Sequence, residues 1–399
     1  MISQKITPIT RKTVLYIINN NVNVIEMSNF NRIILAIFFL AVNIITTHAA
    51  EKEGIMAIIH QVNRNWQHNH TPLVRAFWDE AVYHTGNMEA YFLTGEQTYL
   101  DFSIAWAEHN EWMGAKSVSK SEWLTYYGED DRHVLFGDWQ ICFQTYADLY
   151  NLSPNPRKIA RAREVMEYQM STPKRDYWFW VDALYMVMPV MTKMYRITGN
   201  REYLEKLHTY FSACDSIMLD KATGLYFRDA KYLYPNHKTP SGKKDFWSRG
   251  NGWAIAALAR VLGTLPPDDP YFVDYVSHFR NMAQAMAICQ TPHGYWTRSL
   301  LDNEFAPGPE TSGTALATYA ILWGVNNGIL DQALFEKTIE RAWHYLSHTA
   351  LQADGSVGYI QPIGEKAIPG QVVDANSQAN FGVGAFLLAA CEYYRYIAP

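Results

Sequence analysis

The sequence contains a repeated segment, TGEQTYL at residues 94–100 and TGNREYL at residues 198–204. In both copies the glycine follows the end of one helical pattern, and the Tyr-Leu pair opens the apolar face of the next helix. A helix–turn–helix unit that recurs in a chain of this length predicts helical hairpins packed side by side. The repeat therefore predicts an all-α fold built from hairpins.

From residue 51 onward, apolar residues recur at helical spacing between short polar turns, and almost no stretch alternates at strand period. The pattern predicts twelve helices, over residues 53–67, 73–93, 97–113, 135–150, 156–171, 178–197, 201–218, 250–263, 269–290, 311–328, 332–348 and 376–396. Twelve helices pair into six hairpins, and six hairpins closed into a ring form an (α/α)6 barrel. An open solenoid is the alternative, although its repeats would be more uniform. We interpret residues 51–399 as a single domain of this kind.

The segment before residue 51 has the features of a processing region. Met27 is a second plausible start, followed by Arg32, an apolar run over residues 33–45 and small residues at a spacing that a signal peptidase reads. Because the run is short for a membrane span, we interpret residues 27–50 as a secretory signal peptide and residues 1–26 as an over-long reading frame. An uncleaved anchor is the alternative. The protein is thus expected to be exported, to the periplasm or out of the cell, with no stable membrane span.

Composition narrows the class of ligand. A net charge of −5 argues against a nucleic-acid binder, which normally carries a basic excess. The 13 Trp and 26 Tyr residues offer flat apolar faces with a polar edge, which suit sugar rings, although large helical proteins also pack many aromatic residues. The four cysteines, at positions 142, 214, 289 and 391, show no paired spacing, and the sequence specifies neither a disulfide nor a metal-ligand cluster. No cofactor is expected.

Two aspartates are candidates for acid–base chemistry. Asp182 lies in the strongly aromatic helix start YWFWVDALYM, where partial burial would raise its pKa toward the range of a general acid. Asp138 opens another helix in the segment FGDWQ. Each could instead be an ordinary residue of a helix N-terminus. At the starts of alternate barrel helices, however, both would point into the mouth of the ring, and paired carboxylates are the usual equipment for cleaving a glycosidic bond.

The segment FWSRGNGW, residues 246–253, is the most unusual stretch of the chain. It lacks the glycine spacing and the following Lys-Ser/Thr of a phosphate loop. Trp247 and Trp253 flank Arg249, whose guanidinium matches the geometry of a carboxylate. We interpret the segment as a sugar-stacking surface with a carboxylate-binding fork, with a purely structural turn as the alternative.

Six motifs in order, YHTGNM (83–88), GDWQ (137–140), WVDAL (180–184), WSRGNGW (247–253), ETSGTA (310–315) and GVGAFLL (382–388), give the chain a family resemblance. The sequence resembles glycoside hydrolase family 105, which contains the unsaturated rhamnogalacturonyl hydrolases and is related to the unsaturated glucuronyl hydrolases of family 88. The resemblance covers essentially all of residues 51–399. It implies an (α/α)6 barrel, in agreement with the helix count.

The resemblance also implies a mechanism. Such enzymes act on oligosaccharides left by polysaccharide lyases, which carry a 4,5-unsaturated uronic acid at the non-reducing end. Asp182 would protonate C4, water would add at C5, and the resulting hemiketal would collapse to release the aglycone. By its place in the motifs, Asp138 would position substrate or water. The motifs imply substrate-binding roles for the residues His84, Trp180, Trp247, Arg249 and Trp253.

One position departs from the family pattern. Arg228 stands where the rhamnogalacturonan-specific members tend to place a histidine, and the loop after it contains Lys231, His237, Lys238, Lys243 and Lys244. These cations suggest an aglycone with extra negative charge, such as the sulfated rhamnose of ulvan, with pectic rhamnogalacturonan as the second choice. A solvated basic loop without a ligand is the alternative.

Two other functions compete with this one. An isoprenoid cyclase with an α/α toroid would use the segment QADGS at residues 352–356 and the acidic triplet at residues 129–131. The QADGS segment occurs once and lacks the expected Trp, and the triplet is not spaced as a metal site. A non-catalytic sugar-binding toroid would retain Trp247 and Trp253 without needing Asp138 or Asp182. The sequence specifies neither the oligomeric state nor the preferred length of the oligosaccharide.

Overall fold

The computed structural model of the protein describes residues 50–397. The predictions for residues 1–26 and for the signal peptide up to residue 49 lie outside these described residues. From Lys52 onward the chain forms one compact unit. Within the described range, no helix is both long enough and apolar enough to cross a membrane.

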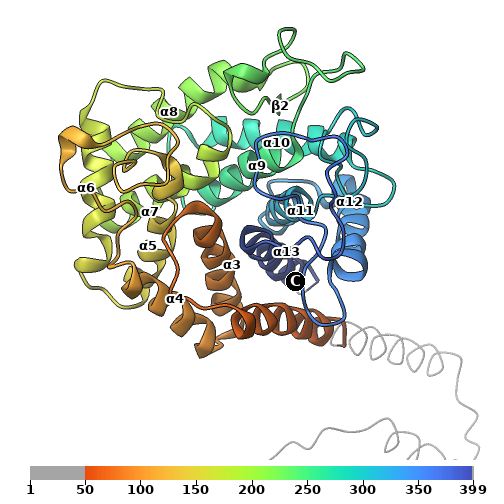
Figure 1. Ribbon diagram of the computed structural model, residues 1–399, viewed down its shortest axis with the longest axis horizontal. Coiled ribbons are helices and arrows are strands. Elements are labelled where there is room, and N and C mark those ends of the chain that lie inside the picture. Colours follow the sequence, from red (N-terminus) through yellow and green to blue (C-terminus); the bar gives the residue numbers. More distant parts are fainter. Residues whose placement is uncertain (1–49, 398–399) are drawn as a thin grey trace, which may run out of the picture. The chain divides into compact units, whose positions relative to one another are not determined.

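Six inner helices close into a ring (Figure 1). They are α3 (Trp78–Thr94), α5 (Cys142–Leu152), α7 (Asp182–Thr198), α9 (Ser248–Leu262), α11 (Thr311–Asn326) and α13 (Asn380–Tyr396). Each packs against the next in this order, and α13 packs against α3. Six outer helices cover them: residues 50–69, α4 (Gln97–His109), α6 (Arg157–Ser171), α8 (Glu202–Met218), α10 (Phe272–Cys289) and α12 (Gln332–Tyr345). The predicted (α/α)6 barrel is confirmed, with twelve such helices in the described part of the chain.

Short elements occupy the connections. They are the 3-10 turns η1 (Lys120–Glu122), η2 (Gly137–Trp139) and η3 (Ala230–Tyr232), the π turn η4 (Leu346–Ala350), and the strands β1 (Leu219–Asp220) and β2 (Leu225–Tyr226). The strands pair antiparallel, with Leu219 opposite Tyr226. The near absence of strand pattern in the sequence agrees with these two-residue strands.

Burial separates the inner helices from the outer ones. In α11 almost every side chain from Thr311 to Leu322 is buried, whereas α6 buries one face. A helix surrounded by other helices has no solvent face, and a covering helix keeps a polar one. The two hydrophobic patterns therefore identify the two layers.

The repeated segment caps two inner helices in the same way. Gly95 and Gly199 end α3 and α7 with a left-handed backbone at φ 69°. The N–H of each glycine donates to a carbonyl four residues earlier, those of Tyr91 and Tyr195, at 2.8 Å in both copies. Because a residue without a Cβ adopts this conformation at little cost, the glycine stops the helix. The interpretation of the repeat is confirmed.

One helix boundary differs from the prediction in a way that shapes the pocket. The helix predicted to begin at residue 178 begins at Asp182. Before it, the N–H of Val181 donates to the carbonyl of Arg228 at 2.8 Å, and Trp180 forms a β-bridge with Asp229. These long-range backbone contacts hold the aromatic segment extended, so the helix starts later.

Other boundaries also shift. The helix predicted over 97–113 ends at His109, because Glu111 and Trp112 adopt positive φ angles of 58° and 62°. The helix predicted over 135–150 is divided into η2 and α5. The helices predicted to begin at residues 73 and 376 begin at residues 78 and 380.

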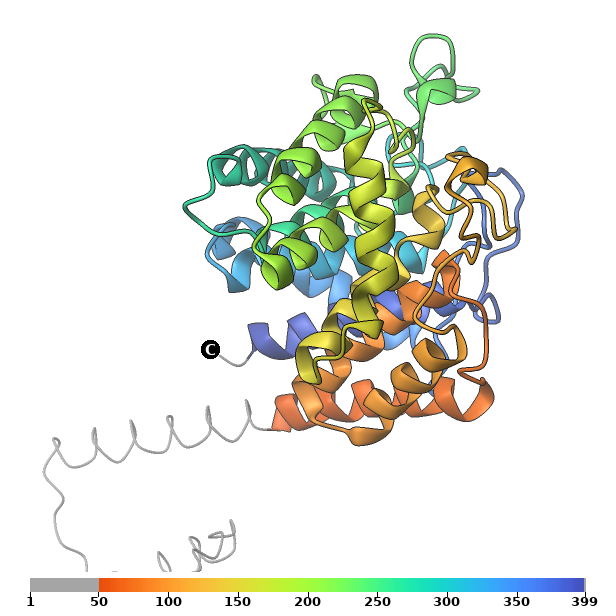
Figure 2. The same ribbon diagram turned by 90° about the vertical axis from the view of Figure 1, so that its left-hand side faces the viewer.

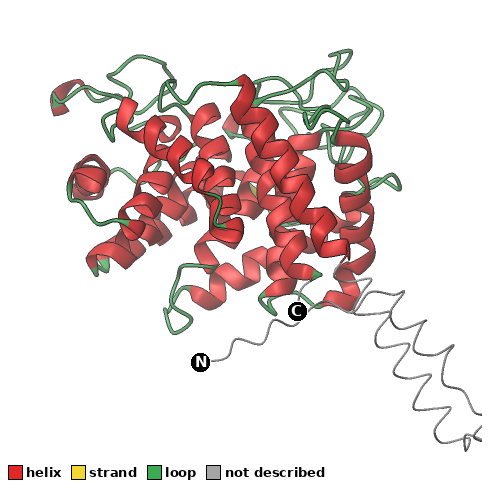
Figure 3. Cartoon of the chain, turned by 90° about the horizontal axis from the view of Figure 1, so that it is seen from below, coloured by secondary structure: helices red, strands yellow, loops and turns green. Residues whose placement is uncertain are grey.

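The long connections gather on one side of the barrel (Figures 2 and 3). In Figure 2 the orange, green and blue loops, around residues 110–136, 219–247 and 351–379, lie together at that side. The starts of inner helices meet there, since Arg249 at the start of α9 reaches Ser312 at the start of α11 and lies over Phe381 at the start of α13. Helix N-termini carry partial positive charge, so this mouth of the ring favours an anionic ligand.

Candidate active site

A pocket of about 500 Å³ opens at this mouth. Inner helix starts and three of the long loops contribute its walls, and it holds four of the predicted site residues. The lining residues are Trp78, Tyr126, Tyr127, Phe136, Asp138, Phe179, Trp180, Asp182, Met186, Arg228, Lys231, Ile363, Gly364 and Glu365. The structure thus brings Asp138, Trp180, Asp182 and Arg228 together.

Asp182 is the first residue of α7, and its side chain is only 13% exposed. Its Oδ2 atom is buried without a hydrogen-bond partner and lies 3.6 Å from Nε of Arg228, which also lacks one. Burial raises the pKa of Asp182 above its usual value, although the positive charges of Arg228 and Arg249 oppose the shift. A carboxyl group of this kind can retain a proton and present it to a ligand.

Asp138 lies in η2, directly before α5, and is also buried. Burial raises its pKa well above the usual value, and the negative charge of Asp182 raises it further, while Arg228 opposes both. Two carboxyl groups that share one pocket titrate as a coupled pair, and the first proton stays on the pair to higher pH than for an isolated aspartate. The pair can therefore donate a proton and accept one.

Arg228 connects the two sides of the pocket. Its Nη1 atom donates to Oδ2 of Asp229 at 2.5 Å and lies 3.4 Å from Oε2 of Glu365, while Nε faces Asp182. Three carboxylates thus surround one guanidinium. Arg228, the cation that was predicted to face the aglycone, therefore lies in the pocket, and protein carboxylates already surround it.

Aromatic side chains form one wall. Phe136 and Trp180 stack with ring centroids 4.3 Å apart and an interplanar angle of 15°. Phe179, Tyr126 and Tyr127 are partly exposed beside them at the pocket rim. Exposed faces of this type stack well against the apolar faces of sugar rings. We call these five residues the aromatic wall.

Trp247 and Trp253 do not belong to this wall, which corrects the stacking surface predicted for them. Trp253 is fully buried, with its ring 4.9 Å from that of Tyr185 and edge-on to Trp78. The indole N–H of Trp247 donates to Oε1 of Gln361 at 2.8 Å. Their faces are covered by protein, so neither indole is open to the pocket.

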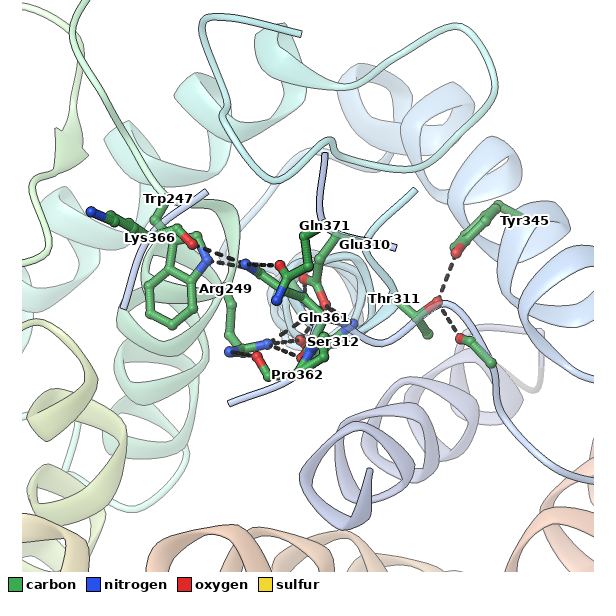
Figure 4. A network of polar contacts seen from close by, with 12 residues as sticks. Trp247, Arg249, Glu310, Thr311, Ser312, Tyr345, Gln361, Pro362, Lys366 and Gln371 are labelled. Carbon is green, nitrogen blue, oxygen red and sulfur yellow. Dashed lines mark hydrogen bonds and ion pairs between the residues drawn. The ribbon is translucent and has the colours of Figure 1, made fainter. Parts of the chain in front are cut away.

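Arg249 is likewise buried, in the polar network of Figure 4. Its Nη1 donates to the carbonyl of Gln361 at 2.7 Å and its Nη2 to that of Pro362 at 2.9 Å. Glu310 lies behind, with Oε1 accepting from the N–H of Gln361 at 3.1 Å and standing 3.9 Å from Nη1 of Arg249. The guanidinium thus binds two backbone carbonyls, in place of the predicted substrate carboxylate, and fastens the base of the 361–371 loop.

His84 also lies outside the pocket. Its ring stacks on Trp106 with centroids 3.9 Å apart, and its Nδ1 shares a hydrogen bond of 2.9 Å with Oγ of Ser103. Burial holds the pKa of His84 well below its usual value. A neutral, stacked imidazole at this place supports the packing of α3 against α4, and His84 does not line the pocket where substrate contact was predicted.

Several pocket residues were not predicted. Glu365 and Ile363 come from the long connection between η4 and α13, which contains several Gly and Pro residues. The adjacent pair Tyr126-Tyr127 lies in the 114–134 connection, where two neighbouring aromatic side chains in a loop were an available signal. Among residues 50–397, no group of His, Cys, Asp and Glu side chains is arranged to hold a metal ion, and the four cysteines are unpaired.

Residues 51–397 match the model of Glycosyl Hydrolase Family 88. The chain belongs to glycosyl hydrolase family 88. The predicted membership of the 105/88 group and the assignment as a hydrolase of O-glycosyl bonds are confirmed. Membership of family 88 is incompatible with an isoprenoid cyclase, and it does not support a non-catalytic sugar-binding protein.

Relatives of this family 88 enzyme include a hydrolase named for an unsaturated sugar. A protein of Formosa agariphila called unsaturated 3S-rhamnoglycuronyl hydrolase is 32% identical over 82% of this chain and 87% of its own length. A solved family 88 structure from Bacteroides vulgatus is 65% identical, with a TM-score of 0.85 over 86% of this chain and 99% of its own. A solved structure that is 64% identical, with a TM-score of 0.85 over 87% of this chain and 98% of its own, is described as a polysaccharide lyase.

Proposed function

We propose that this family 88 enzyme removes a 4,5-unsaturated uronic acid from the non-reducing end of oligosaccharides that polysaccharide lyases leave behind. The observation that carries the proposal is Asp182, a carboxyl group with a raised pKa and an oxygen that accepts no hydrogen bond, which lines a pocket with an aromatic wall. The names of the relatives from Formosa agariphila and Bacillus subtilis, a rhamnoglycuronyl and a rhamnogalacturonyl hydrolase of unsaturated substrates, support it.

The proposed reaction is hydration of the C4–C5 double bond. The carboxyl proton of Asp182 transfers to C4, and the positive charge that develops at C5 is shared with the ring oxygen. Water then attacks C5 and returns a proton to the Asp182 carboxylate, which restores the acid. The resulting hemiketal collapses and releases the aglycone. Asp138 holds substrate or water in place by a hydrogen bond, and the raised pKa of its buried carboxyl group favours the form that can donate one.

For the aglycone, we propose the sulfated rhamnose of ulvan fragments, ahead of pectic rhamnogalacturonan. Relatives in Formosa agariphila and an Alteromonas species, 32% and 35% identical, share the name unsaturated 3S-rhamnoglycuronyl hydrolase. Two lysines of the basic loop already have carboxylate partners in the protein: Lys243 pairs with Asp302, and Lys244 pairs with Asp220. Lys231 lines the pocket, so support for an anionic aglycone rests on Lys231 and Arg228 rather than on the whole loop.

The test is the ultraviolet absorbance of the conjugated double bond in a lyase-generated disaccharide. We expect the protein to abolish that absorbance and Asp182→Asn to slow the reaction by at least about a hundredfold, as for the loss of a general acid. Unchanged thermal unfolding of the variant is the control for folding. An active variant would contradict the assignment of the acid. A rise in absorbance on intact polysaccharide would identify a lyase instead.

The aglycone proposal needs a separate comparison. Rates are measured on disaccharides produced by ulvan, rhamnogalacturonan and glycosaminoglycan lyases. The ulvan product should give the largest kcat/KM, because an anion on the aglycone can reach Lys231 and Arg228. A preference for uncharged aglycones would contradict it.

We also propose that the enzyme acts outside the cytoplasm, in the periplasm or as a secreted protein. The support is the apolar segment with its small residues within 27–50. Fractionation of expressing cells, with N-terminal sequencing of the mature protein, tests this proposal. A full-length protein in the cytoplasm would contradict it.

A further inference from the structure

Glu365 is a protein carboxylate inside the proposed substrate pocket. Its Oε2 lies 3.4 Å from Nη1 of Arg228 and 4.0 Å from Nζ of Lys231. Its Oε1 accepts a hydrogen bond from the hydroxyl of Tyr232 at 2.8 Å. Two cations and one hydroxyl donor thus converge on a single oxyanion. The same three groups could bind an oxyanion of another molecule, since guanidinium and ammonium groups bind sulfate and carboxylate alike.

The contacts of Glu365 are weak compared with those of its neighbours. Both cation distances exceed the range of a charge-assisted hydrogen bond, whereas Asp229 contacts the same guanidinium at 2.5 Å. The side chain of Glu365 is 43% exposed, and such half-exposed pairs contribute little to stability. Within the described residues, Nη2 of Arg228 donates no hydrogen bond, so a ligand could engage it. An entering anion could therefore make better contacts than Glu365 does.

The charge of the pocket depends on whether Glu365 stays in place. Asp229 and Glu365 lie beside Arg228 and Lys231 and offset their two positive charges. Burial raises the pKa values of Asp138 and Asp182, which favours the protonated form of both carboxyl groups. Removal of the Glu365 carboxylate therefore leaves one positive charge unopposed, and this charge attracts an anionic sugar.

The loop that carries Glu365 has a fixed base and an open tip. Gln361 and Pro362 are bound by the buried Arg249 (Figure 4), whereas the next residue, Ile363, is 60% exposed. Gly364 has open space around it, since an added Cβ would meet only the carbonyl of Pro362, at 3.7 Å. A glycine in open space lets the backbone turn at low cost. The carbonyl of Lys366 is also held, by Nε2 of Gln361 at 2.9 Å, so the half-exposed side chain of Glu365 can swing away between two anchored points of the loop.

We propose that Glu365 is an internal counter-anion that occupies the subsite for an anionic group of the substrate, and that the substrate's oxyanion displaces it. The ligand is a sulfate ester or a carboxylate on the sugar chain, and this identity rests on the proposed function. Glu365 thereby sets specificity: it keeps Arg228 and Lys231 oriented in the free enzyme and excludes neutral ligands that cannot replace its charge.

Inorganic sulfate is the probe for this subsite, because its binding needs no turnover. Sulfate is titrated at constant ionic strength while the tryptophan fluorescence of Trp78 and Trp180, which line the pocket, is recorded. Glu365→Gln removes the charge and keeps the shape, so it should bind sulfate about fivefold more tightly than the wild type. Glu304→Gln, at an exposed carboxylate outside the pocket, is the matched control and should not differ from the wild type.

Equal or weaker sulfate binding by Glu365→Gln would overturn the proposal, whatever the enzyme hydrolyses. The kinetic arm uses a sulfated unsaturated disaccharide and its desulfated counterpart. A lower KM for the sulfated substrate alone identifies the sulfate ester as the displacing group, and a lower KM for both identifies the uronate carboxylate. A KM that is unchanged or raised for both would overturn the proposal. If the wild type turns over neither substrate, the proposed function fails while the sulfate titration still decides the role of Glu365.

Discussion

At the scale of residues, Asp138 and Asp182 share one pocket but have different neighbours. Asp182 faces Arg228, whose charge limits the rise of its pKa, whereas the negative charge of Asp182 adds to the rise at Asp138. The proton of Asp138 is therefore retained to higher pH. Loss of the Asp182 proton removes the acid, so a reaction that needs Asp182 as an acid should slow as the pH rises through the raised pKa of that residue.

The raised pKa of Asp138 has a consequence for stability. Between its unfolded pKa, about 3.9, and its higher folded pKa, the folded protein holds a proton that the unfolded chain has released. The free energy of unfolding therefore falls as pH rises, by up to about 1.4 kcal/mol per pH unit for one group. Asp138→Asn has no carboxyl proton to release. Its free energy of unfolding should therefore fall less than that of the wild type between about pH 5 and pH 8.

Thermal unfolding of both proteins at the two pH values measures this difference. Glu80, whose pKa burial raises to about 7, titrates in the same window with the same sign. Glu80 and Asp182 remain in both proteins, so the gap between wild type and variant reports the titration of Asp138 together with its coupling to Asp182. Parallel loss of stability in the two proteins would show that Asp138 is ionised in the folded state.

At the scale of elements, local patterns predicted well what depends on local contacts. The glycine caps at Gly95 and Gly199 follow from residues a few positions away, whereas the start of α7 at Asp182 depends on the distant contact of Val181 with Arg228. The role of Arg249 could not be predicted from local patterns, because its partner Gln361 lies 112 residues further along the chain. Helical periodicity predicts the helix that carries a buried arginine, but it does not predict which residue accepts the arginine's hydrogen bonds. Glu365 was missed for the same reason: its partners Arg228 and Tyr232 are brought to it by the fold.

Arg249 tests whether the base of the 361–371 loop matters for the site. Arg249→Lys keeps the charge but cannot span both carbonyls, so one buried backbone oxygen loses its donor, at about 1–3 kcal/mol. We expect a lower melting temperature, faster proteolysis within the loop, and a KM that rises more than kcat falls. Arg341→Lys, an exposed arginine that binds one carbonyl, is the control. A variant with normal proteolysis and KM would show that Arg249 does not position the loop.

At the scale of the whole molecule, the barrel closes where its first and last inner helices touch. Gly86 on α3 faces Gly384 on α13, and a Cβ on Gly86 would lie 2.2 Å from the carbonyl oxygen of Gly384. A Cβ on Gly384 would lie 2.4 Å from the carbonyl oxygen of Val82. The motifs YHTGNM and GVGAFLL thus meet across the ring although they stand near opposite ends of the sequence. This contact explains why both contain a glycine that no turn requires.

Closure of the ring makes a quantitative prediction. Gly86→Ala forces backbone against backbone, which cannot yield as a side chain would, so it should destabilise the protein by about 1–3 kcal/mol or more. Gly54→Ala lies in the first helix with nothing within 4 Å of the added Cβ, and it should instead stabilise by up to about 1 kcal/mol through helix propensity. Melting temperatures of the two variants and the wild type check both signs.

Because α3 also contributes Trp78 to the pocket, Gly86→Ala should weaken sulfate binding along with stability, whereas Gly54→Ala should leave binding unchanged. Equal melting temperatures for the two variants would mean that the helices can separate at no cost, and the closed ring would then not be what holds the pocket together.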